Sequence, residues 1–291
     1  MTTTAVEAFT EHRPLLFTVA YEMLGSAADA EDVLQESWLR WAKVDHAAVH
    51  NQRAYLVRIV TRQSLNRLRT LQRERETYVG SWLPEPLITA PDVLEDVELA
   101  DSVSFAMLVV LETLTPLERA VFVLREVFGF AYDEIAAATD RAPAAVRQLS
   151  VRARKHVEAR RSRARSPEET TELMSRFFAA ATGGELQPLF DMLAPDVVLI
   201  SDGGGKKKAA LRPLHGPANV ARFLHAVTPR DAALRVEWGV ANGTPAIFLS
   251  IDGEVDSIVT AVVSDGVIRE IYLVRNPDKL AGVRQLRTIR R

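Results

Sequence analysis

Apolar residues in the first half of the chain recur every three to four positions, which is the period of an amphipathic helix. The pattern predicts a first helix that ends at Gly25, because glycine adopts the left-handed conformation of a helix end at low cost. Ser26 and Asp29 then form a start signal for a second helix over about 27–41. A third helix is expected over about 53–76, with arginines on its polar side. We therefore expect an all-helical N-terminal unit.

A second helical unit has sharper start and stop signals. The run Thr115-Pro116-Leu117-Glu118 combines an N-cap, a proline at the first helical position and a capping-box glutamate. That helix should end at Gly129, a short helix should cover about 132–138, and Pro143 should open another that runs to about 161. This order predicts a helix-turn-helix.

Beyond Pro195 the apolar period changes from helical spacing to two, which is typical of strands. Two helices, at about 168–181 and 186–193, precede these runs. Hairpin turns are expected at Asn242-Gly243, Asp252-Gly253 and Asp265-Gly266. Helices followed by an antiparallel sheet make an α+β domain. The predicted strands are 197–200, 234–240, 246–251, 258–263 and 267–274.

Proline and charge mark the expected domain boundaries. Pro84, Pro86 and Pro91 break regular structure, so a linker is expected between the two helical units. The basic C-terminal tail is by default a disordered, solubilising end. The predicted division is a helical unit at 1–77, the linker at 78–91, a helical unit at 92–165, the α+β domain at 166–283 and the tail at 284–291.

The net charge of −2 hides a strong local excess of positive charge. From Arg147 to Arg165 there are eight Lys or Arg residues and a single acid, Glu158. Without cysteine the chain has no disulfide and no thiolate metal site, and its six histidines show no metal-ligand spacing. No cofactor or metal is therefore implied. The absence of a leader and of a long apolar run predicts a cytoplasmic protein without a membrane partner.

The helix that begins at Pro143 is the strongest local signal for nucleic-acid binding. A helix fits the DNA major groove, where its side chains reach base edges while flanking cations neutralise phosphates. An ordinary solvated basic helix is the alternative. The base-facing candidates are Arg147, Gln148, Val151 and Arg152, and the phosphate-facing candidates are Arg154 and Lys155.

Three segments, in order, resemble parts of the extracytoplasmic-function (ECF) sigma factors of RNA polymerase. Residues 29–41 resemble the polymerase-binding helix of region 2, and residues 53–62 resemble the adjoining helix that engages the minus-10 promoter element. Residues 114–119 together with 143–154 resemble region 4, which reads the minus-35 element. Three motifs in the right order are far more specific than a helix-turn-helix alone.

This resemblance implies core RNA polymerase, through its beta-prime and beta subunits, and promoter DNA as partners. An exposed polar helix face without a partner is the alternative for each set. The implied polymerase contacts are Asp29, Asp32, Gln35, Glu36, Leu39 and Arg40. The implied minus-10 contacts, expected to share one helix face, are Arg58, Arg62, Gln63 and Asn66.

The C-terminal domain resembles the SnoaL-like, nuclear-transport-factor-like fold, which a subgroup of ECF sigma factors carries as an extension. The subgroup implies that this domain modulates the sigma activity, and Lys206, Lys207 and Lys208 are expected to pair with Glu85 and Asp92 of the linker. The implied interdomain residues are Trp82, Pro84, Glu85, Pro86, Asp202, Gly203, Gly204, Gly205, Lys206, Asn276, Pro277, Asp278 and Lys279.

We therefore expect a sigma factor that directs promoter-specific initiation, not an enzyme, regulated by its own C-terminal domain. The alternative is a helix-turn-helix regulator fused to a domain that senses a small-molecule ligand. A third interpretation follows from polyketide cyclases of the same fold, which use a pocket Asp or His. Asp202, His215 and Asp256 are the candidates here, but no spacing among them indicates a catalytic pair.

Overall fold

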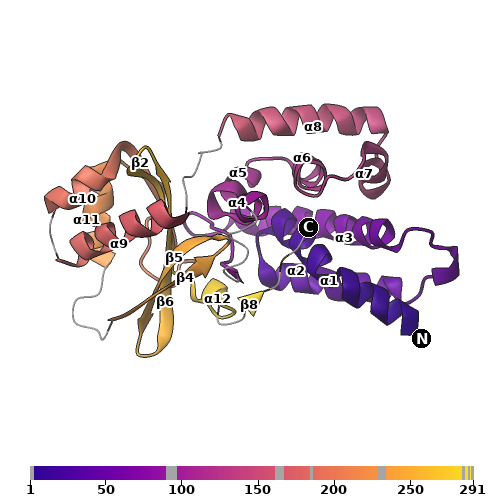
Figure 1. The fold of residues 1–291 in the computed structure, drawn as a ribbon, viewed down its shortest axis with the longest axis horizontal. Coiled ribbons are helices and arrows are strands. Elements are labelled where there is room, and N and C mark those ends of the chain that lie inside the picture. The colour runs from indigo at the N-terminus through magenta and orange to yellow at the C-terminus, as the bar shows by residue number, and fades with distance from the viewer. Residues whose placement is uncertain are drawn as a thin grey trace.

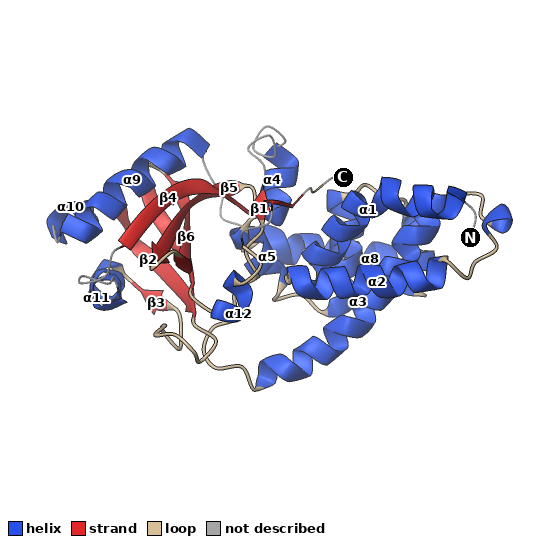
Figure 2. Cartoon of the chain, turned by 90° about the horizontal axis from the view of Figure 1, so that it is seen from below, coloured by secondary structure: helices blue, strands red, loops and turns tan. Residues whose placement is uncertain are grey.

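The computed structural model describes residues 3–89, 97–160, 167–183, 186–227, 234–283, 286–287 and 289. A helical part, which contains α1 to α8, lies beside a part built on a β-sheet (Figure 1). The linker and the last strand lie between the two parts (Figures 1 and 2). None of the described helices is long and apolar enough to cross a membrane.

The first helical unit contains α1 (Thr3–Leu24), α2 (Ala27–Trp41), a short 3-10 helix (His46–Ala48) and α3 (Gln52–Glu76). The predicted helix boundaries are confirmed. Gly25 has a φ of +69°, and the Ser26 hydroxyl accepts a hydrogen bond from the Asp29 amide at the start of α2. The three long helices pack against one another around buried aromatic and aliphatic side chains such as Tyr21 and Leu56.

The second helical unit contains α4 (Val97–Val103), α5 (Phe105–Leu111) and α6 (Pro116–Phe122), which continues as a π-turn (Val123–Val127). The predicted helix-turn-helix is formed by α7 (Tyr132–Thr139) and α8 (Pro143–Glu158). The capping box of Thr115 and Glu118 is present. α7 packs on α3, and apolar side chains of both units join one hydrophobic core.

The C-terminal domain contains one sheet with strand order β3-β2-β7-β6-β5-β4-β1-β8. The expected α+β class is confirmed, and all three predicted hairpin turns form. The expected purely antiparallel sheet is wrong, because β2 runs parallel to β7. The elements are α9 (Pro167–Gly183), α10 (Leu186–Met192), β2 (Leu193–Asp202), β3 (Leu214–His215), α11 (Pro217–Val227), β4 (Leu234–Ala241), β5 (Thr244–Ile251), β6 (Glu254–Ser264), β7 (Val267–Val274) and α12 (Pro277–Leu280).

The linker and the tail are more ordered than their composition predicts. Within the linker, β1 (Ile88–Thr89) pairs antiparallel with β4 through Ala241 and parallel with β8 (Leu286–Arg287). Ile289 is 5% exposed and belongs to the hydrophobic core of the helical part. A disordered tail is therefore wrong for the described positions, and the other tail residues lie outside the described part of the chain. The pairing of β1 with β4 and β8 orders these segments, and their local sequence does not predict it.

The two faces of the sheet pack against different partners. One face packs against α9, α10 and α11 through residues such as Phe177 and Ile271. The opposite face packs against the linker, α5 and α12, where Leu83, Phe105 and Tyr272 join one apolar cluster. The linker thereby lies between the C-terminal domain and the helical part, with Leu83 and Leu87 buried and Val79 exposed.

Candidate functional site

The exposed face of α2 carries the predicted polymerase contacts. Five of them are exposed, including Leu39, an apolar side chain with 60% of its surface exposed. Asp29 differs, because Arg67 of α3 donates to its carboxylate from Nε at 2.7 Å and Nη2 at 2.6 Å. The exposed set is Asp32, Gln35, Glu36, Leu39 and Arg40.

The predicted minus-10 residues on α3 do not share one face. Arg58, Arg62 and Asn66 recur every four residues and lie along one side of the helix. Gln63 is only 7% exposed, and its amide donates to the Glu36 carboxylate at 3.1 Å. The expectation of a shared donor face is therefore wrong for Gln63, which joins α2 to α3.

The second helical unit contacts the side of α3 that carries Arg62, although the Arg62 side chain stays exposed. The Arg62 guanidinium donates to the carbonyls of Ala137 at 3.0 Å and Ala138 at 3.4 Å, near the C-terminal end of α7. The Arg53 guanidinium lies 4.5 Å from the centre of the Phe130 ring. Carbonyls at a helix C-terminus carry partial negative charge, so α7 offers Arg62 the kind of acceptor that a phosphate would.

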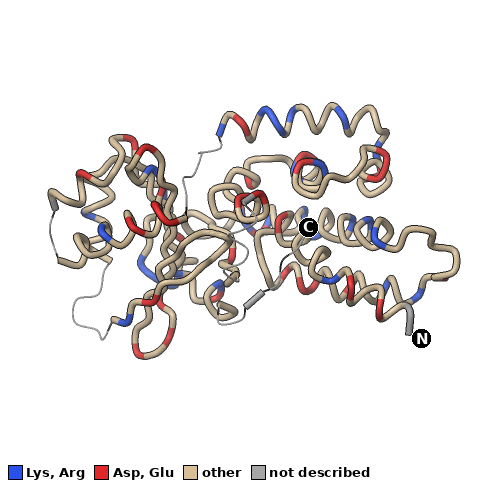
Figure 3. The backbone as a smooth tube through the Cα atoms, in the orientation of Figure 1, with Lys and Arg blue, Asp and Glu red and all other residues tan. Residues whose placement is uncertain are grey.

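The helix α8 buries one face and exposes the other. Val146, Ser150, Ala153 and Val157 are buried against the rest of the unit. Figure 3 shows several Lys and Arg positions along α8, and on the opposite, exposed face lie basic side chains together with Val151, which is 44% exposed. The six predicted minus-35 contacts all lie on this exposed side: Arg147, Gln148, Val151, Arg152, Arg154 and Lys155.

The Asp202 carboxylate, at the end of β2, binds the linker and is fully buried. It accepts hydrogen bonds from the Tyr78 hydroxyl at 2.6 Å and the Leu83 amide at 2.9 Å. The Lys279 ammonium lies 2.7 Å from the same carboxylate. A buried carboxylate is costly unless it is paired and hydrogen-bonded, and here the linker supplies part of that compensation.

Lys279 is enclosed by aromatic rings of the linker. Its ammonium lies 4.0 Å from the centre of the Trp82 ring and 5.1 Å from that of Tyr78. Burial lowers the pKa of Lys279 to about 8, and the Asp202 carboxylate opposes this shift. At neutral pH the side chain stays largely protonated, so the contact is an ion pair combined with cation–π interactions.

The loop after β2 fits closely against the α12 turn and the linker. Gly204 has a φ of +59°, and a Cβ there would lie 2.4 Å from the Asn276 amide nitrogen. A Cβ on Gly205 would lie 3.2 Å from the side chain of Val79. The Asn276 amide itself donates to the Tyr78 hydroxyl at 2.8 Å. A side chain at Gly204 would therefore collide with Asn276 unless the loop moved.

Glu85 of the linker binds the N-terminus of the predicted polymerase-binding helix α2. Its carboxylate accepts hydrogen bonds from the amides of Ala27 at 2.8 Å and Ala28 at 3.2 Å, and from the Ser26 hydroxyl at 3.2 Å. Its backbone amide donates to the Gly25 carbonyl at 2.8 Å. A carboxylate at a helix N-terminus satisfies free amides and complements the helix dipole. The linker is thus fixed to both the C-terminal domain and α2.

The expected pairing of the lysine run with linker acids is not found for Glu85, which is bound to α2. Lys206 pairs with Asp278 at 2.6 Å, and Lys207 pairs with Asp256 at 2.9 Å. Lys208 donates to the Ala226 carbonyl at 3.4 Å. Asp92 lies outside the described residues. The lysines therefore stabilise the C-terminal domain itself, and Asp202 and Lys279 make the contact with the linker.

Two interdomain contacts were not predicted from the sequence. Glu112, at the end of α5, pairs with both Arg75 of α3 and Arg119 of α6. Asn242, in the β4–β5 turn, is fully buried and bonds to α1, the linker and α4. An isolated Glu in a helical run and an Asn-Gly turn carry no signal for such roles, because their partners are distant in sequence.

The C-terminal domain contains an interior cavity of about 60 Å³ between the sheet and its helices. Its walls are mainly apolar, with Met174, Phe177 and Ile271 among them, and Asp256 and Arg275 also line it. Both Asp256 oxygens are already bound, one to Lys207 and the other to Arg275 at 2.9 Å. Within the described residues no cluster of side chains is arranged to hold a metal ion.

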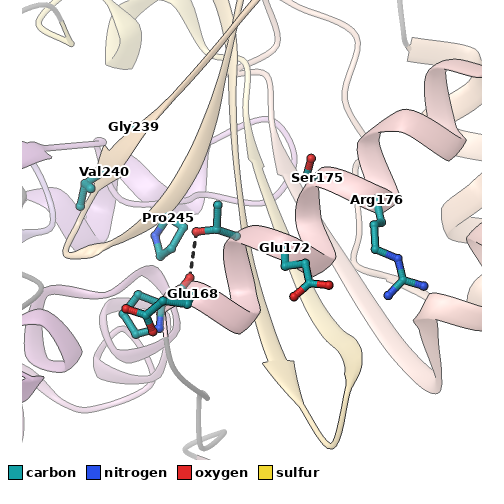
Figure 4. A pocket seen from close by; sticks show the side chains of 9 residues that line it. Glu168, Glu172, Ser175, Arg176, Gly239, Val240 and Pro245 are labelled. Carbon is teal, nitrogen blue, oxygen red and sulfur yellow. Dashed lines mark hydrogen bonds between the residues drawn. The ribbon is translucent and has the colours of Figure 1, made fainter.

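An open hollow of about 710 Å³ lies between the first turns of α9 and the strands β4 and β5. Figure 4 shows the labelled Glu168, Glu172 and Arg176 on the helix side and Gly239 and Val240 on the strand side. None of the predicted site residues lines it. The hollow is therefore separate from the linker contacts.

Comparisons with known proteins identify both helical units. The model of the family "Sigma-70 region 2" matches residues 8–74, and that of "Sigma-70, region 4" matches residues 104–165. The chain is 36% identical to the ECF RNA polymerase sigma factor SigJ of Mycobacterium tuberculosis, over 95% of this chain and 93% of SigJ. It is 27% identical to the probable ECF sigma factor SigI of the same organism, over 95% of each chain.

The three-dimensional structure is similar to a solved relative over nearly its full length. The crystal structure of M. tuberculosis SigJ superposes with a TM-score of 0.77 at 34% identity, and the match covers 96% of this chain and 99% of that one. The similarity therefore extends across both helical units and the α+β domain.

Proposed function

The chain belongs to the ECF sigma factors, and from that premise we propose that its C-terminal domain regulates initiation by binding the linker between regions 2 and 4. A sigma factor binds RNA polymerase and directs transcription initiation, which is the function of this chain. The observation that carries the regulatory proposal is the buried Asp202, which binds the linker through Tyr78 and Leu83. We also propose that the chain divides into region 2 at 1–77, the linker at 78–91, region 4 at 92–165, the C-terminal domain at 166–283 and a tail at 284–291.

We propose that α2 binds the beta-prime subunit of core polymerase and that region 4 contacts the beta subunit. The exposed Leu39, beside Glu36 and Arg40, supports this role, because an exposed apolar residue with polar neighbours is typical of an interface centre. Asp29 would act through Arg67, its partner on α3.

For promoter DNA, we propose that α8 enters the major groove of the minus-35 element and that the Arg58, Arg62 and Asn66 side of α3 meets the minus-10 strand. Six exposed side chains of α8 support the first assignment. Gln63 is not part of this proposal, since it is buried against α2.

The observed packing of region 4 on region 2 corresponds to a closed state. The minus-10 and minus-35 elements are about 25 base pairs apart, which is roughly 85 Å of duplex at about 3.4 Å per base pair. Two touching units of about 70 residues have centres within roughly 30 Å of each other. Region 4 must therefore leave α3 before both elements are bound, and the linker contacts oppose that movement.

Transcription in vitro with core polymerase tests this proposal. Asp202→Asn keeps the size of the side chain but removes the charge that pairs with Lys279. We expect a several-fold change in promoter-dependent transcript, because linker release changes the balance between closed and open states. The control Asp196→Asn, at a side chain 77% exposed, should leave the yield unchanged. Equal yields from wild type and Asp202→Asn would reject regulation through this contact.

We also propose that the C-terminal domain binds a small-molecule ligand. The apolar cavity with Arg275 in its wall supports this proposal. The cavity of about 60 Å³ has room for a few water molecules, so a ligand would have to displace α9 or α11 from the sheet. An aromatic carboxylate matches apolar walls and an arginine. A ligand of this kind should raise the unfolding temperature of the full chain. It should not raise that of the Ile271→Trp variant, in which the larger side chain fills the cavity.

We propose that the C-terminal domain is not catalytic and that the protein acts in the cytoplasm, beside core polymerase. The carboxylate oxygens of Asp202 and Asp256 are all held by Tyr78, Leu83, Lys or Arg partners. His215 is exposed on β3. A general acid or base needs a carboxylate oxygen that can reach its substrate, and the oxygens of both aspartates are already engaged by these partners.

A further inference from the structure

Three hairpin turns of the C-terminal domain have the same chemistry but different surroundings. Asn242-Gly243, Asp252-Gly253 and Asp265-Gly266 all have positive φ at both positions. Nothing lies within 4 Å of a Cβ built on Gly253 or Gly266, and both turns are exposed. A Cβ on Gly243 would lie 2.6 Å from the Ala100 Cα, and Asn242 is 0% exposed. Turn formation alone does not require this burial.

The Asn242 side chain bonds to three segments that are far apart in sequence. Its amide nitrogen donates to the Tyr21 hydroxyl of region 2 at 2.6 Å and to the Val103 carbonyl, at the end of α4, at 2.9 Å. Its amide oxygen accepts from the Leu87 amide of the linker at 2.9 Å. Tyr21 in turn donates to the Glu85 carbonyl at 2.7 Å.

The chemistry at this position requires a carboxamide. Tyr21 already donates its proton to Glu85, so its oxygen is available only as an acceptor for Asn242. The Val103 carbonyl is also an acceptor. Asparagine is compatible with a positive φ and provides both a donor and an acceptor, whereas aspartate is compatible with the same φ but, when ionised, provides acceptors only.

We propose that the Asn242-Gly243 turn is a latch by which the C-terminal domain holds region 2, the linker and region 4 in the closed state. The proposal rests on the proposed regulatory function and adds a second contact, independent of Asp202, at the β4–β5 turn instead of the end of β2. Separation of region 4 from region 2 pulls Val103 away from Tyr21 and breaks the hydrogen bonds of Asn242. The latch therefore joins linker release to opening of the DNA-binding regions.

Asn242→Asp is the decisive variant, since the exposed turns at Asp252 and Asp265 form with aspartate at the equivalent position. The chain has no cysteine, so Glu11→Cys on α1 and Glu158→Cys on α8, both at exposed positions, accept a donor and an acceptor dye. Single-molecule energy transfer then counts open and closed molecules without polymerase. Asp252→Asn is the matched control, because it makes the reciprocal change at an exposed turn.

We expect Asn242→Asp to raise the ratio of open to closed molecules about tenfold or more, because two buried acceptors lose their donor. Asp252→Asn should leave the ratio unchanged. Tyr21→Phe removes one acceptor of Asn242 and keeps the ring, so it should also raise the ratio of open to closed molecules. If Asn242→Asp does not fold, the ratio measured for Tyr21→Phe tests the latch in its place. An unchanged ratio in the folded variants overturns the latch.

The energy-transfer result is independent of the sigma assignment, because polymerase is absent from the measurement. If Asn242→Asp raises the ratio of open to closed molecules but Asp202→Asn does not change transcription, the latch is supported and the proposed regulation is rejected. An unchanged ratio together with a transcription response would reject the latch and keep the regulation.

Discussion

At the residue scale, buried polar groups of the linker find their partners in the C-terminal domain. Asp202 binds Tyr78 and Leu83, and Asn242 binds Leu87. Each such group would cost free energy if it were buried without its partner. The C-terminal domain therefore contributes to the stability of the linker in this position, together with the contact of Glu85 with α2.

Gly204→Ala tests how closely the loop after β2 is packed. Gly204 and Gly253 both have positive φ, so alanine costs roughly 1–2 kcal/mol at either site for backbone strain. Only Gly204 adds a clash, since its Cβ would lie 2.4 Å from the Asn276 amide nitrogen. We expect Gly204→Ala to lower the free energy of unfolding in urea by about 1–3 kcal/mol more than Gly253→Ala. Equal losses would show that the loop relaxes freely.

At the element scale, α8 combines a buried stripe with an exposed basic stripe. Val146, Ser150, Ala153 and Val157 fix its orientation in region 4. The same orientation exposes Arg152 and Lys155. The packing of one face thus determines which side chains are available to DNA.

Arg152→Ala and Lys155→Ala should weaken promoter binding in different ways. A base contact is worth about 1–3 kcal/mol and carries sequence preference, so Arg152→Ala should relax specificity within the minus-35 element. A phosphate contact carries no sequence information, so Lys155→Ala should weaken binding to all sequences and lower the salt slope by about 1. Holoenzyme binding to a promoter library at several salt concentrations measures both. Identical specificity profiles would reject the base role of Arg152.

At the scale of the whole molecule, two separate parts of the C-terminal domain, the end of β2 and the β4–β5 turn, hold the linker against the helical part. Asp202 and Lys279 bind its first half, whereas Asn242 and β1 bind its second half. Glu112 joins regions 2 and 4 directly through Arg75 and Arg119. A charged contact of this kind loses less on exposure to water than an apolar one, which suits an interface that opens.

The closed state should open when polymerase and promoter are both bound. Labels at Glu11→Cys and Glu158→Cys report the separation of α1 from α8, which lie in regions 2 and 4. Because the two promoter elements are roughly 85 Å apart, energy transfer should fall nearly to zero in the open complex. Free protein in the same buffer is the control. Undiminished transfer in an active complex would contradict the closed-state interpretation.

Local sequence patterns were sufficient to predict the helices, their caps and the hairpin turns and to identify the family motifs, because each depends on residues a few positions apart. Gly25, Thr115-Glu118 and the Asp-Gly turns all form as predicted. The resemblance to a sigma subgroup singled out Asp202 and Trp82 as interdomain residues, and their regulatory role stays a prediction.

The contacts between residues that are distant in sequence became known only from the tertiary structure. The burial of Gln63, the binding of Glu85 to α2, the pairing of β1 with β8 and the position of Asn242 all depend on segments brought together by packing. Periodicity shows which face of a helix or strand is apolar, but it does not show what packs on that face. The contacts between the C-terminal domain, the linker and the DNA-binding regions were therefore beyond the reach of local sequence patterns.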